Sequence, residues 1–519
     1  MKTHEAVRFG TIALLFCVRT SAMAATFAHD SFISFADHSY DGDDIIVSNC
    51  TLTVDGSHAF NSMQLIHGGV LTHSAFPYGP QLLVFPVVNE AHDLASNFPA
   101  ALSNTNVDGS SIVVLNISGT ITYAEGVDYV VTSANNVTSL TLTANSSIPT
   151  GSTVLVSYNW IQSFQGFNLS ISNALEIDSA SLINVSGKGY TGGIGFQNGA
   201  GASLSTNFPF AFTAGGGGAH GGSGGMSSTF ARGGAPYDSP TNPISAGSGG
   251  GPGTQPGGAG GGVASLVVGG NLQIDGQILA NGFKGTNAHS GGGAGGTIII
   301  SAQTFSGAGV IVANGGGGDS PDGGGGGGGR VAIYFGTNNF TGRTIAFGGH
   351  GANAGGAGTV YMRAIGSTAG QLSIINGGQR GTNTPFSALG VVNLQIGGGA
   401  VAQSQSAAIN VTNLFIGSNS WLTASNTSPF NITAANATIE SNGMINADSR
   451  AGSGQGTGTF NGCGAGSGGS YGGYGGSSVC GSPSGMTYGS LTQPTSSGSA
   501  GGLSAGSSRP AARGGGAIK

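Results

Sequence analysis

The sequence predicts an all-β protein: a right-handed parallel β-helix solenoid with glycine-rich (polyglycine II-like) loop excursions and a small inserted antiparallel β-module. Glycine accounts for 103 of 519 residues, about three times its average usage. Apolar residues fall in short β-branched runs between turns, and no run after the first 24 residues has the 3.6-residue period of a helix. Short strands that repeat along a chain of this length are typical of stacked units that bury their apolar faces on one another.

Residues 1–24 have the pattern of a secretory signal peptide. Lys2 and Arg8 precede the apolar stretch FGTIALLFCV, and small residues end the segment at Ala22 and Ala24. We expect cleavage after Ala24 and a secreted or cell-surface protein. No later apolar run reaches the ~18–20 residues of a membrane-spanning helix, so no membrane span is expected after cleavage.

The mature chain divides into three predicted regions. Residues 25–104 alternate apolar and polar side chains and predict the N-terminal β-helix coils. Residues 105–160 alternate in longer strands punctuated by Pro149 and Gly151, which predicts an inserted β-sandwich-like module of antiparallel strands. Residues 161–519 predict a glycine-rich β-helix. Its last residues, GGGAIK, stop where other glycine runs enter a strand, so we expect truncation at the C-terminus.

A recurring junction joins glycine runs to strands in the third region. It occurs as GGGVASLVV (260–268), GGAGGTIIIS (292–301), GGGGRVAIYF (326–335) and GGAGTVYMR (355–363), and the spacing from Thr297 to Arg330 is 33 residues and from Arg330 to Thr359 is 29. Glycine has no Cβ, so neighbouring excursions can run side by side as extended segments. A flexible glycine linker is the alternative, but the regular return to a strand favours ordered loops.

The strand that follows the longest glycine run predicts its own buried face. Side chains alternate along a strand, so Val331, Ile333 and Phe335 are expected to face the core. Ala332 and Tyr334 are then expected to face outward.

Three cysteines remain after the signal segment, too few for a disulfide-built scaffold. Cys463 and Cys480 flank the loop GAGSGGSYGGYGGSSV, whose chain entropy a crosslink would restrict, so they are the disulfide candidate. Cys50 is then unpaired. No cysteine or histidine spacing predicts a zinc site.

Charged residues are scarce, at 7% of the chain with a net charge of −6. No dense basic cluster exists to neutralise phosphates, so nucleic-acid binding is not expected. The acidic stretch DHSYDGDD supplies weak calcium candidates at Asp37, Asp41, Asp43 and Asp44, although a solvated turn explains it as well. His58 and His73 are expected to stack near the entrance of the solenoid rather than to bind a metal. No catalytic motif is present, and no cofactor is expected beyond calcium.

Three stretches resemble a known class of proteins: DGSHAFNSMQLIHGGVLTHS, SGKGYTGG and GGGGGGGRVAIYF. They are similar to the large secreted glycine-rich parallel β-helix (pectin-lyase-like solenoid) surface proteins of bacteria. The segment YAEGVDYVV…IPTGSTVLVSY resembles small β-sandwich modules of long bacterial surface proteins and phage tail-associated proteins. The resemblance implies a right-handed parallel β-helix, an architecture that adhesins, polysaccharide lyases and tail spikes share, and it does not choose among their functions.

The expected function is that of an extracellular structural or adhesive protein whose glycine-rich loops form a binding or packing face. The alternative is a polysaccharide-degrading β-helix enzyme, a lyase or glycoside hydrolase, which needs clustered carboxylates that are sparse here. Expected partners are a polysaccharide or cell-surface protein, and a further β-helix or C-terminal anchor region of the same or another chain. The ligand-contact candidates are the aromatic and cationic residues of the excursions: Tyr190, His220, Arg232, Tyr237, Lys284, His289, Tyr471 and Tyr474.

Overall fold

The structure is a computed structural model of the 519-residue chain. It describes residues 24–519 except 76–80, 97, 106, 135–136, 165, 194–199, 202, 206–212, 287–288, 388–390, 426–428, 451–454, 461–464 and 504–511. The predicted signal segment therefore lies outside the described residues except for Ala24. The described residues contain strands, turns and extended segments and no helix.

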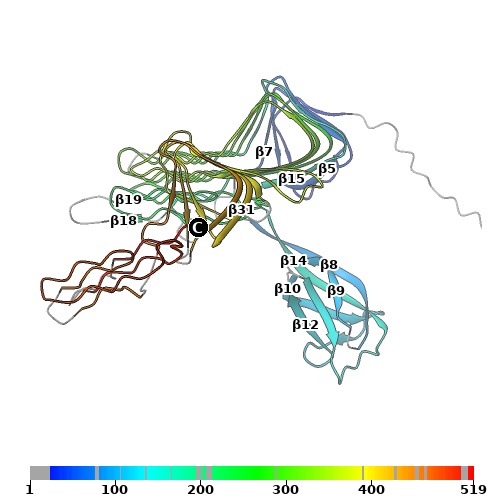
Figure 1. The fold of residues 1–519 in the computed structure, drawn as a ribbon. Helices are drawn as coiled ribbons and strands as arrows, with labels where there is room; N and C mark the ends of the chain where they lie inside the picture. The colour runs from blue at the N-terminus through cyan, green and yellow to red at the C-terminus, as the bar shows by residue number, and fades with distance from the viewer. Residues whose placement is uncertain are drawn as a thin grey trace, which may run out of the picture.

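Most strands belong to three sheets in which neighbouring strands run parallel, with one antiparallel exception (Figure 1). The largest follows the order β1-β3-β6-β16-β20-β22-β24-β26-β27-β29-β31-β33, with β5 and β15 paired beside this path. Its strands are β1 (Ala25–Phe27), β3 (Asp44–Ser48), β5 (Gly56–Phe60), β6 (Ser62–Ile66), β15 (Gly166–Ile171), β16 (Leu175–Ile177), β20 (Val263–Ile274), β22 (Thr297–Gly307), β24 (Arg330–Phe340), β26 (Thr359–Ala364), β27 (Gly370–Ile375), β29 (Val391–Gly397), β31 (Ala408–Ile416) and β33 (Asn431–Ile439).

The two smaller parallel sheets take the strands that follow in the chain. One contains β2 (Ser31–Ile33), β4 (Thr51–Val54), β7 (Val70–Thr72), β17 (Leu182–Asn184), β21 (Gln277–Leu279), β23 (Val310–Val312) and β25 (Arg343–Ile345). The other contains β28 (Asn383–Phe386), β30 (Val401–Ser404), β32 (Trp421–Ala424) and β34 (Met444–Asn446). From β20 to β26 the chain alternates between the largest sheet and its seven-stranded neighbour, as a stacked arrangement requires.

The predicted repeat spacing matches the strand register. Thr297 on β22 lies opposite Arg330 on β24, and Arg330 lies opposite Thr359 on β26. These are the positions at which each glycine run enters its strand. The sequence junctions therefore mark equivalent points of successive steps in the sheet.

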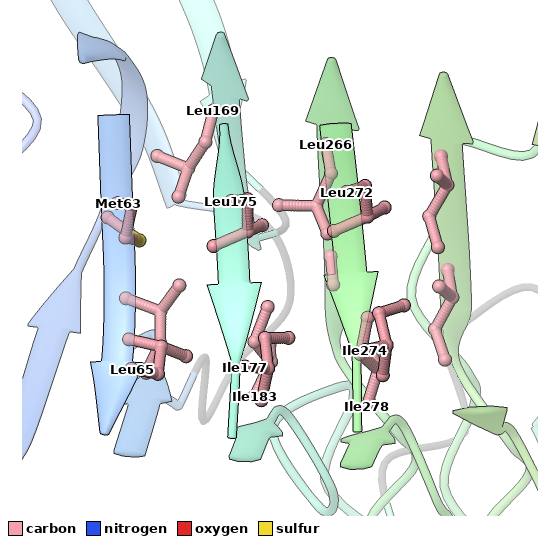
Figure 2. Close-up of a cluster of buried hydrophobic side chains, with 14 of the residues drawn as sticks. Met63, Leu65, Leu169, Leu175, Ile177, Ile183, Leu266, Leu272, Ile274 and Ile278 are labelled. Carbon is pink, nitrogen blue, oxygen red and sulfur yellow. The ribbon is translucent and has the colours of Figure 1, made fainter. Parts of the chain in front are cut away.

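Aliphatic ladders fill the space between the two larger sheets (Figure 2). Leu175 lies between Met63 and Leu272 on the neighbouring strands, and all three are fully buried. Figure 2 shows Ile177 following Leu175 along β16 and Ile274 following Leu272 along β20. Each strand thus places its apolar residues against those of the strands on either side, and the removal of this surface from water stabilises the stack.

The alternation predicted for β24 is correct for Val331 and Ile333 and wrong for Ala332. Val331, Ala332 and Ile333 are all fully buried, and Tyr334 and Phe335 are half-buried. The second face of the strand is covered as well, because the Tyr334 hydroxyl donates to the Thr241 carbonyl oxygen in a glycine-rich excursion. Both faces of β24 are therefore inside the protein at its first residues.

One pair of neighbouring strands in the largest sheet is antiparallel. β26 and β27 pair antiparallel, with Tyr361 opposite Leu372, after a turn that contains Gly366 at φ +86°. A second buried cluster follows, which includes Tyr361, Leu394 and Leu422. The uniformly parallel stack predicted from the sequence is wrong at this point, since a short hairpin replaces the long return between parallel strands.

The antiparallel module is longer than the predicted boundaries 105–160. It contains one sheet of β8 (Gln81–Leu94), β10 (Val107–Asn116), β11 (Thr122–Tyr123) and β14 (Ser152–Phe164), and a second of β9 (Ala100–Thr105), β12 (Tyr129–Ala134) and β13 (Val137–Leu142). Because β8 pairs with β14 along their lengths, the module extends to Gln81 at one end and to Phe164 at the other. Figure 1 shows the module projecting from the parallel sheets. The stack continues past it, because β15 pairs with β5 on one side and β20 on the other.

Candidate binding surface

The glycine excursions of residues 189–358 form a hydrogen-bonded bundle, which we call the first bundle. Within its segment 323–329, the five successive amides of residues 324–328 donate to the carbonyl oxygens of Gly215, Asn353, Gly316, Gly218 and Gly356 at 2.9–3.0 Å. One segment thus bonds to several neighbours in different directions, whereas a strand in a sheet bonds to two neighbouring strands. The described glycine segments are therefore held to one another by main-chain hydrogen bonds, which a flexible linker would not form.

Where its glycine segments meet, the first bundle is packed so closely that side chains do not fit. A Cβ atom on Gly327 would lie 2.0 Å from the Gly222 carbonyl oxygen, and one on Gly217 would lie 1.9 Å from that of Gly325. Both distances are far below van der Waals contact. Glycine is therefore required here by space, since the segments approach backbone to backbone. A short antiparallel pair, β18 (Ser203–Ser205) and β19 (Thr213–Gly215), lies within this region.

Buried polar side chains tie the first bundle to the largest sheet. The Arg330 guanidinium donates through Nε and Nη2 to the Tyr237 carbonyl oxygen at 3.0 and 2.7 Å, and through Nη1 to Thr359 Oγ1 at 3.2 Å. Burial lowers the pKa of Arg330 to about 10, against the opposing effects of Asp238 and Tyr237. The guanidinium stays charged at neutral pH and holds the segment around Tyr237 on the entrance of β24.

His220 and Asp238 form the next part of this network. His220 is buried, with Nδ1 3.0 Å from the Gly295 carbonyl oxygen and Nε2 3.5 Å from Asp238 Oδ2. Burial lowers the pKa of His220 more than Asp238 raises it. Burial also raises the pKa of Asp238, but hydrogen bonds from His220, Ser245 and Ser239 outweigh this and keep it well below the usual range. The group holds loop 237–245 in place.

The eight contact candidates do not share one surface. His220 and Tyr237 pack against each other with ring centroids 4.9 Å apart, and the Tyr237 hydroxyl lies 2.9 Å from Ser248 Oγ. Tyr190 is half-buried and its backbone pairs with the glycine segments, whereas Arg232 and Lys284 are exposed. His289 is half-buried, with Nδ1 2.8 Å from Asp322 Oδ2. These six residues belong to the first bundle, where only the two cations are fully available for contact.

Tyr471 and Tyr474 lie in a separate glycine-rich region at 455–516, which we call the second bundle (Figure 1). Tyr471 is half-buried and packs against Tyr488 at a centroid distance of 5.1 Å. Tyr474 is 74% exposed. Cys480 is disulfide-bonded, and because Cys463 lies outside the described residues its role as partner stays a prediction. Cys50 is a free, buried thiol, as expected.

A shallow polar groove lies on the outer face of β29, β31 and β33. It has a volume of about 300 Å³ and is lined by Gln371, Asn393, Leu394, Gln395, Asn413, Leu414, Phe415, Asn436 and Thr438. Asn413 donates to Asn393 at 2.6 Å, and Asn436 donates to Asn413 at 2.9 Å. The lining offers amides, a hydroxyl and an aromatic ring without any charged group. The sequence analysis missed it, because three asparagines 20 and 23 residues apart signal nothing until the strand register is known.

The four calcium candidates do not form one ligand set. Asp37 accepts hydrogen bonds from Ser39, and Asp44 accepts from Asn61 and Ser62, which lowers the pKa of each carboxyl. Asp41 instead lies beside two histidines: its Oδ2 is 2.8 Å from His38 Nδ1 and its Oδ1 is 3.4 Å from His58 Nδ1. Of the described residues, only these three form a group with metal-ligating atoms close together. The sequence analysis missed this group because Asp41 and His58 belong to successive passes of the chain along the sheet and meet only in the folded protein.

His73 is buried at the junction of sheet and bundle, where its ring packs edge-on against Phe167. Its Nδ1 donates to the Ser74 carbonyl oxygen at 2.7 Å, and its Nε2 accepts the Val263 amide at 3.2 Å. Burial lowers the pKa of His73 to about 4 despite the hydrogen bond to Ser74. Two satisfied ring nitrogens and a neutral ring give it a structural role.

No helix of the described residues has the length and hydropathy needed to cross a membrane. Comparisons with known protein families, with curated proteins and with solved structures found no match for this chain. The resemblance to bacterial β-helix surface proteins therefore remains an expectation.

Proposed function

We propose that this chain is an extracellular structural or adhesive protein, built as a right-handed parallel β-helix solenoid whose excursions pack in the polyglycine II manner. The first bundle is the observation that carries this proposal. Its segments are held by main-chain hydrogen bonds and by contacts too close for side chains. Such an assembly has little internal freedom, so it suits a rigid support. Secretion follows from the signal-like first 24 residues.

The polar groove is the adhesive part of this proposal, with a neutral polysaccharide as its ligand class. Amides in a row supply paired donors and acceptors for sugar hydroxyls, and Phe415 supplies an apolar ring face. A lyase or hydrolase needs carboxylates or a cationic base beside the scissile bond. None lines this groove, which favours binding over cleavage.

Binding to immobilised neutral polysaccharides tests the adhesive part. We expect the double variant Phe415→Ala, Gln395→Ala to lose at least tenfold in affinity while keeping its unfolding temperature within a few degrees. Phe32→Ala is the matched control, since Phe32 is exposed and lies on β2. Equal binding by all three proteins would remove the groove from the proposal.

The enzyme alternative has its own test. Purified protein is incubated with pectin, alginate and glycosaminoglycans, and new reducing ends and unsaturated products are measured. We expect none above the rate of a heat-denatured control. Sustained release of products would replace the proposal with the degrading enzyme.

A further inference from the structure

The second bundle repeats the architecture of the first. Residues 217–251 align without a gap to residues 468–502, each position 251 residues later, and about half of the aligned pairs are identical. Much of this identity is glycine, but Tyr237, Ser239 and Thr241 also recur, as Tyr488, Ser490 and Thr492. We call the two segments the first and second units.

Equivalent hydrogen bonds recur in both units. The Tyr237 amide donates to the His220 carbonyl oxygen at 3.0 Å, and the Tyr488 amide donates to that of Tyr471 at 2.9 Å. The hydroxyls of the two tyrosines lie 2.9 Å from Ser248 Oγ and 2.7 Å from Ser499 Oγ. Side-chain geometry as well as glycine content is therefore shared, which chance similarity of glycine runs does not explain.

The two units differ in what covers one face. In the first unit, Cβ atoms on Gly221, Gly222 and Gly225 would meet the carbonyl oxygens of Gly329, Gly356 and Asn353 at 2.4, 2.2 and 1.9 Å. The covering residues belong to the glycine segments 323–329 and 353–358. At the equivalent Gly472, Gly473 and Gly476, a Cβ would meet nothing described within 4 Å. This open face of the second unit consists of Gly472, Gly473, Tyr474 and Gly476.

Side chains beside the open face are more apolar than their equivalents. Ser228 of the first unit bonds to Asp322 at the start of the covering segment, through both its amide and its hydroxyl. Its equivalent is Val479, which is 97% exposed. Ser223 donates its amide to Asn383 at 3.0 Å, and its equivalent is the exposed Tyr474. A large apolar side chain at each of these two positions is typical of a surface that a partner covers.

We propose that the open face of the second unit binds an extended glycine-rich segment of another polypeptide, in the way segments 323–329 and 353–358 cover the first unit. The ligand must be nearly free of side chains, because the approach is backbone to backbone. Tyr474 and Val479 then contact the flanks of the bound segment. This inference rests on the proposed packing function and names its partner.

A peptide with the sequence of residues 321–330, PDGGGGGGGR, is the probe. We expect it to bind the full chain, measured by calorimetry, and a peptide with alanine at alternate glycines to bind at least tenfold more weakly. The double variant Gly472→Ala, Gly473→Ala should lose the binding by the same factor. Its unfolding temperature should not fall, since neither new methyl group meets a neighbour.

Gly515→Ala is the matched control, because Gly515 is also exposed with open space at its Cβ position. It should bind the peptide as the unaltered chain does. Self-association of the full chain that the double variant abolishes would identify the partner as a second copy and support the inference. No peptide binding, or equal binding by the double variant, would overturn it. Polysaccharide binding is measured separately, so failure of the adhesive function and failure of this inference are distinguishable.

A different observation carries a second inference, at His38, Asp41 and His58. The His58 side chain is fully buried, and its Nε2 lies 3.1 Å from the Asp55 carbonyl oxygen, which only accepts. The proton of a neutral ring is therefore on Nε2. Nδ1 makes no hydrogen bond and directs its lone pair toward Asp41 Oδ1 at 3.4 Å. A lone pair beside a carboxylate is repulsive unless a cation lies between them.

We propose that these three residues bind a divalent transition metal ion such as Zn²⁺. His38 Nδ1, an Asp41 oxygen and His58 Nδ1 supply nitrogen and oxygen ligands of the kind zinc prefers. The bond from His58 Nε2 to a backbone carbonyl is the support that usually orients a metal-bound histidine. A calcium ion fits poorly, because two of the three ligands are nitrogens.

Calorimetric titration of the purified chain with Zn²⁺ at pH 7.5 tests this site. We expect one ion per chain, a rise in unfolding temperature, and visible absorption from Co²⁺ bound in its place. The His38 side chain is 58% exposed, so the variant His38→Gln should fold normally. Both His38→Gln and His58→Gln should bind Zn²⁺ at least tenfold more weakly. The control His29→Gln should not. Absence of binding, or binding kept in His38→Gln, would show that a proton bridges His58 and Asp41 instead.

Discussion

The antiparallel module and the first glycine bundle obtain rigidity in different ways. The module has a side-chain core that includes Leu94, Val114, Leu140, Val154 and Val156, all nearly or fully buried. The first bundle has few side chains inside, and its segments are joined by backbone hydrogen bonds. In the module the interior tolerates a small change of volume by repacking. In the bundle the interior is main chain, which has no alternative rotamers.

The largest expected difference concerns a single added methyl group. Gly327→Ala places a Cβ 2.0 Å from a carbonyl oxygen in the bundle and should cost about 3 kcal/mol, the upper part of the usual overpacking range. Gly109→Ala in the module meets only Val131 at 3.9 Å and should change stability by less than about 0.5 kcal/mol. Denaturant unfolding measures both. Equal losses would show that the bundle relaxes as the module does.

The second-largest expected difference between the two regions is in how their stability responds to acid. The folded pKa of His73 is about 4, against 6.5 for the free side chain. Between these values the unfolded chain binds more protons, so stability falls as the pH is lowered. From pH 7 to pH 5 His73 alone should account for a loss of about 2 kcal/mol in the parallel sheets and their bundle, and His220, whose pKa burial also lowers, adds to it. His73→Gln should reduce this dependence by the share that His73 contributes. In the module the pKa values of Glu90 and Asp128 are lowered, so the module should lose stability only at lower pH. If the unfolding transitions of both regions fell together between pH 7 and pH 5, the role given to His73 would be contradicted.

The smallest expected effect tests side chains within the second bundle. Tyr471→Ala removes a ring that packs against Tyr488 and should cost about 1 kcal/mol. Tyr474→Ala removes an exposed ring and should cost less than about 0.5 kcal/mol. Thermal unfolding of the two single variants distinguishes them. The sequence analysis gave both tyrosines the same role as ligand contacts, and equal effects on stability would show that the ring packing of Tyr471 does not distinguish them.

Much of the fold could be predicted because the sequence repeats at the level of single junctions. Thr297, Arg330 and Thr359 lie opposite one another as their spacing suggested. The reversal at β26 and β27 could not be predicted, since a turn with one left-handed glycine looks the same before a parallel or an antiparallel strand. The burial of Ala332 was missed because the pattern of β24 does not show the excursion some 90 residues earlier in the chain, which bonds to Arg330 and Tyr334 on either side of Ala332.

The candidate sites were harder to predict than the fold. Asp41 and His58 were each noted, but as members of different groups, because their contact depends on the register between β3 and the strands after it. Arg330 was noted only as the start of a strand. The sequence did contain a signal for its burial under Tyr237. Arg330 directly follows seven glycines, which have no side chains to keep its guanidinium away from the packed segments of the bundle.

The absence of side chains from segment 323–329 has a consequence for proteolysis. Proteases choose where to cut by fitting side chains into pockets and by drawing an extended stretch of substrate out of the fold. Segment 323–329 offers no side chain to recognise, and its amides are already bonded to neighbouring segments. Cleavage should therefore fall on the exposed loops that carry side chains, such as the one around Arg232, while the glycine segments stay intact.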